Sequence, residues 1–131
     1  MRQVYWWRRV WEEDRPEDLP LVNVAAHWLL DHAPPLDHVS SVHGDFRAGN
    51  FLFLEATAQV TTWLDWELAV LGDRHQDLAW ASPPHCGHFA EDGTSFLASG
   101  LLPTAEFLAR YEQSSGLRVD AERLRYFRIF Q

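Results

Sequence analysis

The sequence predicts an α+β fold that is mostly helical, with one short β-hairpin near its centre. Apolar residues recur at the 3.6-residue period in several segments that proline or glycine terminates, which is typical of amphipathic helices. Three shorter apolar runs between these segments have the length and the flanking turn residues of strands. With 131 residues, of which 47% are hydrophobic and 23% charged, the chain has the composition of one globular domain or of part of one.

Two helices are predicted in the first quarter of the chain. Residues 2–14 place four aromatic side chains among basic and acidic residues, and Pro16 ends this segment. We expect the aromatic face of this helix to need a covering partner. Apolar residues then recur at helical spacing from Leu19 to His32, and two prolines follow directly after the helix.

Three short strands are predicted next, at residues 39–42, 51–54 and 60–64. The last two are separated by the sequence Glu-Ala-Thr-Ala-Gln, whose length suits a hairpin turn. The centre of the chain is therefore expected to hold a small sheet.

Helical patterns return after Gly72. Asp73 is predicted to cap a helix that runs through Trp80 and ends before Pro83 and Pro84. Residues 85–93 are predicted to form a loop, and residues 96–97 a short helix.

Two more helices are predicted in the last part of the chain. Residues 103–114 form the first, with Thr104 as its cap and Gly116 beyond its end. Asp120 opens the second, and its apolar stripe still continues at Gln131. We therefore expect the chain to be cut within this helix.

Composition excludes several kinds of chemistry. All eleven basic residues are arginine, so this chain cannot supply a P-loop lysine, a Schiff base or the nucleotide-binding lysine of a kinase small lobe. A single cysteine, Cys86, excludes an intrachain disulfide and a four-thiolate zinc site. The net charge of −8 argues against binding of nucleic acid through phosphate contacts. Because no membrane span and no secretory signal are present, we expect a cytoplasmic protein without a membrane partner.

Three polar residues are expected to converge at one end of the predicted hairpin. Asp45 follows the first predicted strand, Asn50 lies five residues later, and Asp65 ends the hairpin. The gap from Asp to Asn is that of the catalytic loop of protein kinases, in which Asp is the base and Asn binds a magnesium ion. One carboxylate, one amide oxygen and the phosphates of ATP form a chemically sensible magnesium site.

These motifs resemble the aminoglycoside phosphotransferase family. They read VHGDFRAGNFL at residues 42–52, WLDWELA at 63–69, LGD at 71–73 and DLAW at 77–80. They are most similar to the phosphotransferase domains related to those joined to acyl-CoA dehydrogenases, and the similarity extends over nearly the whole chain. The resemblance implies an ATP-dependent kinase that phosphorylates a small-molecule hydroxyl.

The resemblance also implies a role for individual residues. Asp45 would be the catalytic base, and Asn50 and Asp65 would bind Mg²⁺ with ATP. His43 would brace the loop as a structural histidine, and Asp77 would support the loop from the helix that follows.

For some other residues near the motifs, more than one interpretation of their role stays open. Arg47 contacts phosphate or substrate, or else forms a surface salt bridge. Glu67 touches the metal ion, contacts a metal ligand or is solvated, and Asp73 caps its helix. Trp66 and Trp80 wall a substrate pocket or pack in the core.

A second cluster, His85, Cys86 and His88, holds three metal-ligating side chains within four residues. Its spacing is poor for zinc and a fourth ligand is missing, so we do not predict a zinc site there.

The resemblance places residues 1–131 in the C-terminal, large lobe of a protein-kinase-like fold, without the N-terminal nucleotide-binding lobe. ATP binding would then need the missing small lobe or a complementing chain. Two other hypotheses stay open. One is a non-catalytic binding module derived from the large lobe, and the other is a metal-dependent hydrolase that uses His43 and Asp45.

Overall fold

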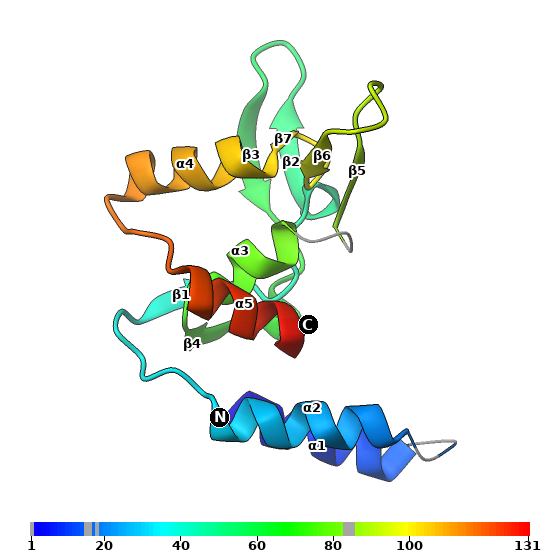
Figure 1. Cartoon of the computed structure of the whole chain (residues 1–131). Coiled ribbons are helices and arrows are strands. Elements are labelled where there is room, and N and C mark those ends of the chain that lie inside the picture. The colour runs from blue at the N-terminus through cyan, green and yellow to red at the C-terminus, as the bar shows by residue number, and fades with distance from the viewer. Residues whose placement is uncertain (1, 15–16, 18, 83–85) are drawn as a thin grey trace.

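The structure is a computed structural model and describes residues 2–14, 17, 19–82 and 86–131 (Figure 1). The five helices of the described residues are α1 (Arg2–Asp14), α2 (Pro20–Asp31), α3 (His75–Ala81), α4 (Thr104–Ser115) and α5 (Ala121–Phe130). The strands of these residues are β1 (Ser40–Val42), β2 (Phe51–Leu54), β3 (Gln59–Trp63), β4 (Val70–Gly72), β5 (Gly87–Phe89), β6 (Phe96–Ala98) and β7 (Leu102–Pro103). Two 3₁₀ turns, Ala48–Asn50 and Trp66–Leu68, flank the β2–β3 hairpin. The predicted α+β class is therefore confirmed.

The strands form three small antiparallel sheets. β2 pairs with β3 in the predicted hairpin, β1 pairs with β4, and β5, β6 and β7 form a third sheet in that order. In the hairpin, Phe51 lies opposite Trp63, and the register shifts between Leu52 and Phe53. β1 precedes the hairpin in the chain and β4 follows it. These two strands pair with each other, with Ser40 opposite Gly72 and Val42 opposite Val70.

The prediction for the segment before α4 is wrong. Residues 96–97 belong to strand β6 instead of a helix, and the predicted loop at 85–93 contains strand β5. At Gly87 an added Cβ would lie 2.2 Å from the carbonyl oxygen of Leu97, so only glycine permits this close pairing. A three-residue strand is too short to show a hydrophobic period. Pairing between β5 and β6 determines the conformation of these residues instead.

The helix ends agree with the predictions in part. Asp120 caps α5 by accepting hydrogen bonds from the backbone N–H groups of Glu122 and Arg123, and Gly116 ends α4 in the left-handed region with φ of 71°. Thr104 is the first residue of α4 and makes no capping bond, because Pro103 occupies the cap position. Pro83 and Pro84, which were predicted to end α3, lie outside the described residues.

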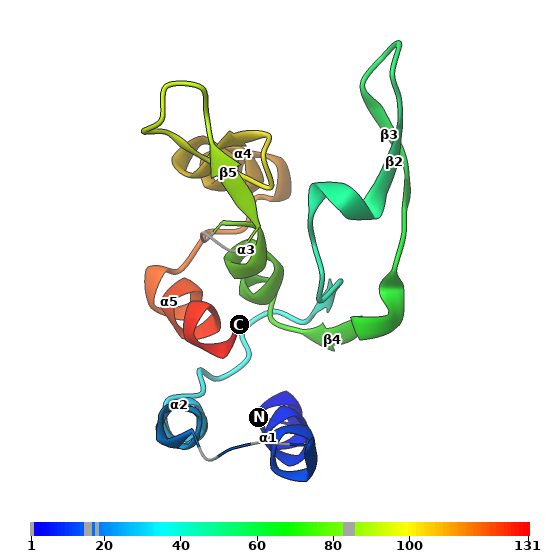
Figure 2. The ribbon, with the colours of Figure 1, turned by 90° about the vertical axis from the view of Figure 1, so that its right-hand side faces the viewer.

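Asp73 was predicted as the N-cap of α3, but Arg74 occupies that position. Asp73 lies one residue earlier, where its Oδ1 accepts from the backbone N–H of His75 at 3.0 Å and from His75 Nδ1 at 2.6 Å. His75 Nε2 in turn accepts from the backbone N–H of Asp120, and Asp73 Oδ2 accepts from Arg123 at 2.6 Å. Asp73 therefore links the start of α3 to the start of α5. The ribbons of these two helices lie beside each other in Figure 2.

Two apolar clusters share helix α5. Val4, Leu29 and Tyr126 pack α1 and α2 against it, and the Tyr126 hydroxyl donates to the carbonyl oxygen of Leu29 at 2.9 Å. On its other side, Leu124 packs with Leu78 and Ala79 of α3. α5 thus joins the α1–α2 pair to the part of the chain that carries the predicted site.

The β2–β3 hairpin extends away from the helices in Figure 2, and its apolar residues Leu52, Phe53, Leu54 and Val60 are exposed. Within the described part of the chain, no helix combines the length and the apolar character needed to cross a bilayer.

Candidate active site

The loop between β1 and β2, residues 43–50, carries most of the predicted site. It starts directly after Val42, which is fully buried where β1 pairs with β4. Gly44 has φ of 88°, and a Cβ at this position would lie 2.7 Å from the carbonyl oxygen of Leu68. The second residue of the His-Gly-Asp motif must therefore be glycine, because both its backbone conformation and its surroundings exclude a side chain.

Asp77 of α3 binds the start of this loop. Its Oδ2 accepts from the backbone N–H of His43 at 2.7 Å, and its Oδ1 accepts from the backbone N–H of Gly44 at 2.9 Å. Burial raises the pKa of Asp77, and these two hydrogen bonds offset only part of that rise. The carboxylate thereby satisfies two backbone donors that have left the β1 ladder.

His43 is buried within the loop. Its Nε2 lies 2.8 Å from the carbonyl oxygen of Leu64, and its Nδ1 lies 3.3 Å from the backbone N–H of Asp45. Since a carbonyl only accepts, Nε2 carries the proton and Nδ1 accepts from Asp45. The ring also contacts Trp66, with the ring centroids 4.6 Å apart. Both nitrogens are thus engaged with the backbone in the neutral form of the ring.

The Asp45 carboxylate, 18% exposed, receives three hydrogen bonds. Its Oδ2 accepts from Asn50 Nδ2 at 2.7 Å and from Arg47 Nε at 3.1 Å, and its Oδ1 accepts from Trp80 Nε1 at 2.7 Å. Burial alone would raise the pKa of Asp45, but the hydrogen bonds from Asn50, Arg47 and Trp80 lower it below its ordinary value. The group is therefore an oriented, ionised carboxylate.

Asn50 is buried at the end of the loop. Its Nδ2 donates to the carboxylate of Asp45 and also to the Asp45 backbone carbonyl at 2.9 Å. The amide nitrogen thus faces Asp45, and the amide oxygen is the Asn50 atom left to bind a cation.

Asp65 lies at the same end of the hairpin as Asn50. The backbone N–H of Leu64 donates to the carbonyl oxygen of Asn50 at 2.8 Å, which fixes the chain just before Asp65. Asp65 itself is exposed and has φ of 63°, a left-handed conformation that aspartate tolerates better than most residues. Among the described residues, no three His, Cys, Asp or Glu side chains gather into a preformed metal cluster.

The remaining predicted residues lie in different surroundings. Arg47 forms an ion pair with Asp45. Glu67 is exposed on the Trp66–Leu68 turn. Asp73 lies in the α3–α5 cluster, where burial would raise its pKa but hydrogen bonds from His75 and Arg123 lower the pKa to about 2.

The hydrogen bond from Trp80 to Asp45 was not identified from the sequence, because Trp80 was interpreted as a core residue or as part of a pocket wall. It lies three residues after Asp77 on α3, so both side chains project from the same face of the helix. That spacing was the available signal: a residue bound to the loop backbone and a donor one turn later can reach the same loop.

The second predicted cluster is only partly described, because His85 lies outside the described residues. Cys86 is half-buried, and burial, together with the nearby charge of Asp45, raises the pKa of its thiol. His88 lies in β5 against Gly100, where an added Cβ would come 2.7 Å from the ring.

Comparison with known proteins decides the family. The family model described as "Phosphotransferase enzyme family" matches residues 1–127. The chain belongs to this family. The predicted resemblance to the phosphotransferase family is thus confirmed.

Relatives and solved structures agree with this assignment. Acyl-CoA dehydrogenase family member 11 of Gallus gallus is 31% identical over 134 residues, which cover 96% of this chain and 17% of the relative. A crystal structure from Ralstonia eutropha assigned to the aminoglycoside phosphotransferases is 28% identical with a TM-score of 0.73, covering 98% of this chain and 42% of that one. An aminoglycoside-3'-phosphotransferase of type VIII is 26% identical with a TM-score of 0.64, covering 90% of this chain and 40% of that one. The kinase-like fold is therefore established, and the chain spans less than half the length of these relatives.

Proposed function

We propose that this chain is the large lobe of an ATP-dependent kinase that phosphorylates a hydroxyl group of a small molecule. The observation that carries the proposal is the Asp45 carboxylate, which Asn50 binds from the same loop at 2.7 Å. Both residues lie at the base of the hairpin that ends at Asp65.

Asp45 would accept the proton of the substrate hydroxyl. Its Oδ2 already receives two hydrogen bonds and its Oδ1 only one, so Oδ1 keeps the lone pair that can face an incoming hydroxyl. Asp77 and His43 would keep the loop backbone in place, which matters because phosphoryl transfer depends mainly on positioning.

Magnesium fits the oxygen donors at this site. Asn50 would supply its amide oxygen and Asp65 its exposed carboxylate, and Mg²⁺ favours such hard ligands together with water and phosphate oxygens. When bound, the ion would neutralise charge on the ATP phosphates.

ATP binding would require a small lobe, supplied by a longer form of this protein or by a complementing chain. The described residues hold no lysine, and the chain spans 42% of the Ralstonia eutropha structure. We therefore propose that residues 1–131 are a large lobe only and that this chain alone turns over little or no substrate. A cytoplasmic location of the complete enzyme is a separate part of the proposal.

The metal part of the proposal is testable on this chain without turnover. Mn²⁺, which accepts the same oxygen ligands, should broaden the NMR signals of Asn50 and of residues 64–66. Asp65→Asn should abolish this broadening, whereas Glu55→Gln, an exposed change in the hairpin turn, should preserve it. Broadening centred elsewhere, or unchanged by Asp65→Asn, would contradict the proposed magnesium site.

A non-catalytic interaction module is the second candidate function. It is favoured by the exposed apolar residues of the hairpin, which suit contact with another protein. Phosphotransfer by the lobe-completed protein would reject this alternative.

A further inference from the structure

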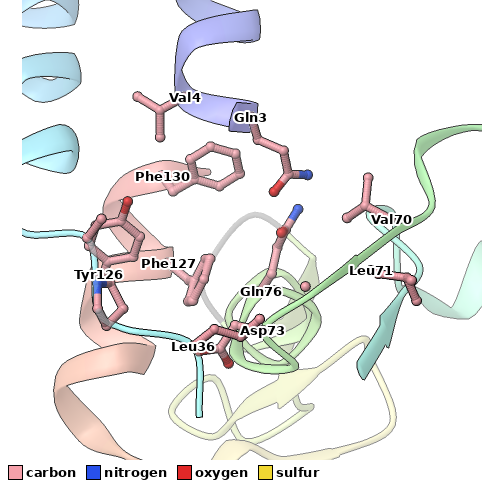
Figure 3. A pocket seen from close by; sticks show the side chains of 13 residues that line it. Gln3, Val4, Leu36, Val70, Leu71, Asp73, Gln76, Tyr126, Phe127 and Phe130 are labelled. Carbon is pink, nitrogen blue, oxygen red and sulfur yellow. The ribbon is translucent and has the colours of Figure 1, made fainter. Parts of the chain in front are cut away.

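A pocket of about 350 Å³ lies apart from the candidate active site. It opens between α1, the segment after α2, β4, α3 and α5, and Figure 3 shows it from close by. None of its lining residues belongs to the loop at 43–50 or to the turn at 65–68. Its volume falls in the range of about 300–1,000 Å³ that is typical of small-molecule sites.

Gln76 of α3 points into this pocket while it is only 5% exposed. Among the described residues, none forms a hydrogen bond with its side-chain amide, and this amide faces the open space of the pocket. Figure 3 shows the Gln3 side chain of α1 directed toward it from the opposite side of the pocket. Two carboxamides thus face the same space, and no hydrogen bond joins them.

The other polar groups of the lining are already engaged. Asp73 binds His75 and Arg123, and the Tyr126 hydroxyl donates to Leu29. The rest of the lining is mostly apolar, with Phe127 and Phe130 on one side and Val70 on the other. The pocket therefore offers aromatic surface and two neutral amides, with no unpaired charge among its described residues.

We propose that this pocket binds a small neutral ligand with a flat apolar body and one amide-like group. The body would pack against Phe127 and Phe130, and its adjacent donor and acceptor would pair with the carboxamide of Gln76. A charged ligand is disfavoured because no opposite charge is free to pair with it. This inference is independent of the proposed phosphotransferase function.

Benzamide is a suitable probe, and benzoate is its charged counterpart of nearly the same shape. With the ¹⁵N-labelled chain and no nucleotide, benzamide should shift the side-chain signals of Gln76 and Gln3 in a saturable manner. Benzoate should not produce these shifts. Gln76→Leu should weaken benzamide binding about tenfold or more, the size expected for one lost hydrogen bond to a buried group.

A matched control variant is Gln113→Leu, since Gln113 is exposed on α4 and far from the lining. It should bind benzamide as the wild-type chain does. Gln76→Leu should leave the melting temperature nearly unchanged, because the Gln76 amide forms no hydrogen bond with the described residues and opens to the pocket.

Three results would overturn the inference. The first is equal binding of benzamide by the wild-type chain and Gln76→Leu, and the second is equal binding of benzoate and benzamide. The third is a shift of the same signals on dilution alone, which would mean that a second copy of the chain fills the pocket. If Gln76→Leu fails to fold, Gln3→Leu replaces it in the first comparison, and benzamide binding by Gln3→Leu equal to that of the wild-type chain would overturn the inference.

Discussion

The loop at 43–50 and the hairpin that follows it are adjacent in sequence but opposite in character. In the loop, His43 and Asn50 are buried, and the Asp45 carboxylate receives three hydrogen bonds. In the hairpin, every residue of β2 after Phe51 and the first four residues of β3 are exposed. A two-stranded hairpin of this kind has little stability of its own.

The proposed reaction requires fixed catalytic groups and an open surface for the small lobe, and the loop and the hairpin meet these two requirements separately. The groups that would handle the substrate proton are fixed by contacts within the chain, chiefly from α3. The surface beside them is left for something else to cover, as the proposal of a small lobe requires. The loop should therefore respond to substitution as a structural unit, and the hairpin should respond mainly through its partner.

The largest expected effect is on turnover of the complete enzyme with its small lobe. Asp45→Asn should lower kcat by about 10²- to 10⁴-fold, the usual worth of a general base, and leave Mg-ATP affinity nearly unchanged. Steady-state rates and titration calorimetry with Mg-ATP measure both quantities.

Asp65→Asn provides the contrast, because it should weaken Mg-ATP binding and turnover together. If Asp45→Asn abolished nucleotide binding while Asp65→Asn left it intact, the two roles would be wrongly assigned.

Asp77→Ala should destabilise the isolated chain by about 1–3 kcal/mol, because it leaves the buried N–H groups of His43 and Gly44 without an acceptor. Urea denaturation measures the loss. Glu55→Gln, an exposed change in the hairpin turn, is the matched control and should have almost no effect. Equal losses in the two variants would remove the proposed difference between loop and hairpin.

Acid should weaken the α3–α5 connection through Asp73. Its pKa is about 2 in the folded chain and 3.8 in the unfolded reference, so its stabilisation is fully present above pH 3.8 and is lost as the pH falls toward 2. The lost contribution is roughly 2 kcal/mol. In Asp73→Asn, the free energy of unfolding should fall less between pH 4 and pH 2 than in the wild-type chain. Parallel pH profiles for the two proteins would contradict this role.

The smallest effect is expected in the hairpin. Phe53→Ser should change the free energy of unfolding of the isolated chain by no more than about 0.5 kcal/mol, because Phe53 is 56% exposed. The same variant should weaken association with a separately supplied small lobe, which pull-down or calorimetry can measure. A large loss of stability in the isolated chain would show that the hairpin packs within this lobe.

Sequence reasoning succeeded where the deciding residues are close together in the chain. The cap at Asp120, the left-handed Gly116 and the hairpin turn are all set within a few residues. The contact between Asp45 and Asn50 is likewise local, so the five-residue spacing was enough to place them together.

Long-range pairing explains what the sequence did not reveal. β4 was not predicted, since a three-residue strand has no period and its partner Ser40 lies 32 residues earlier. The Trp80 contact spans 35 residues and the link from His75 to Asp120 spans 45. Such contacts depend on how elements pack, which neither propensity nor period specifies.

Helix α3 is only seven residues long, yet its successive side chains address different neighbours. His75 contacts the start of α5, Gln76 faces the pocket, Asp77 binds the loop backbone, and Trp80 binds Asp45. A change of register by one residue would rotate each side chain by about 100° and send all of them to the wrong neighbour at once. An insertion or deletion within α3 should thus be far more damaging than any single substitution there, because one rotational setting serves the whole site.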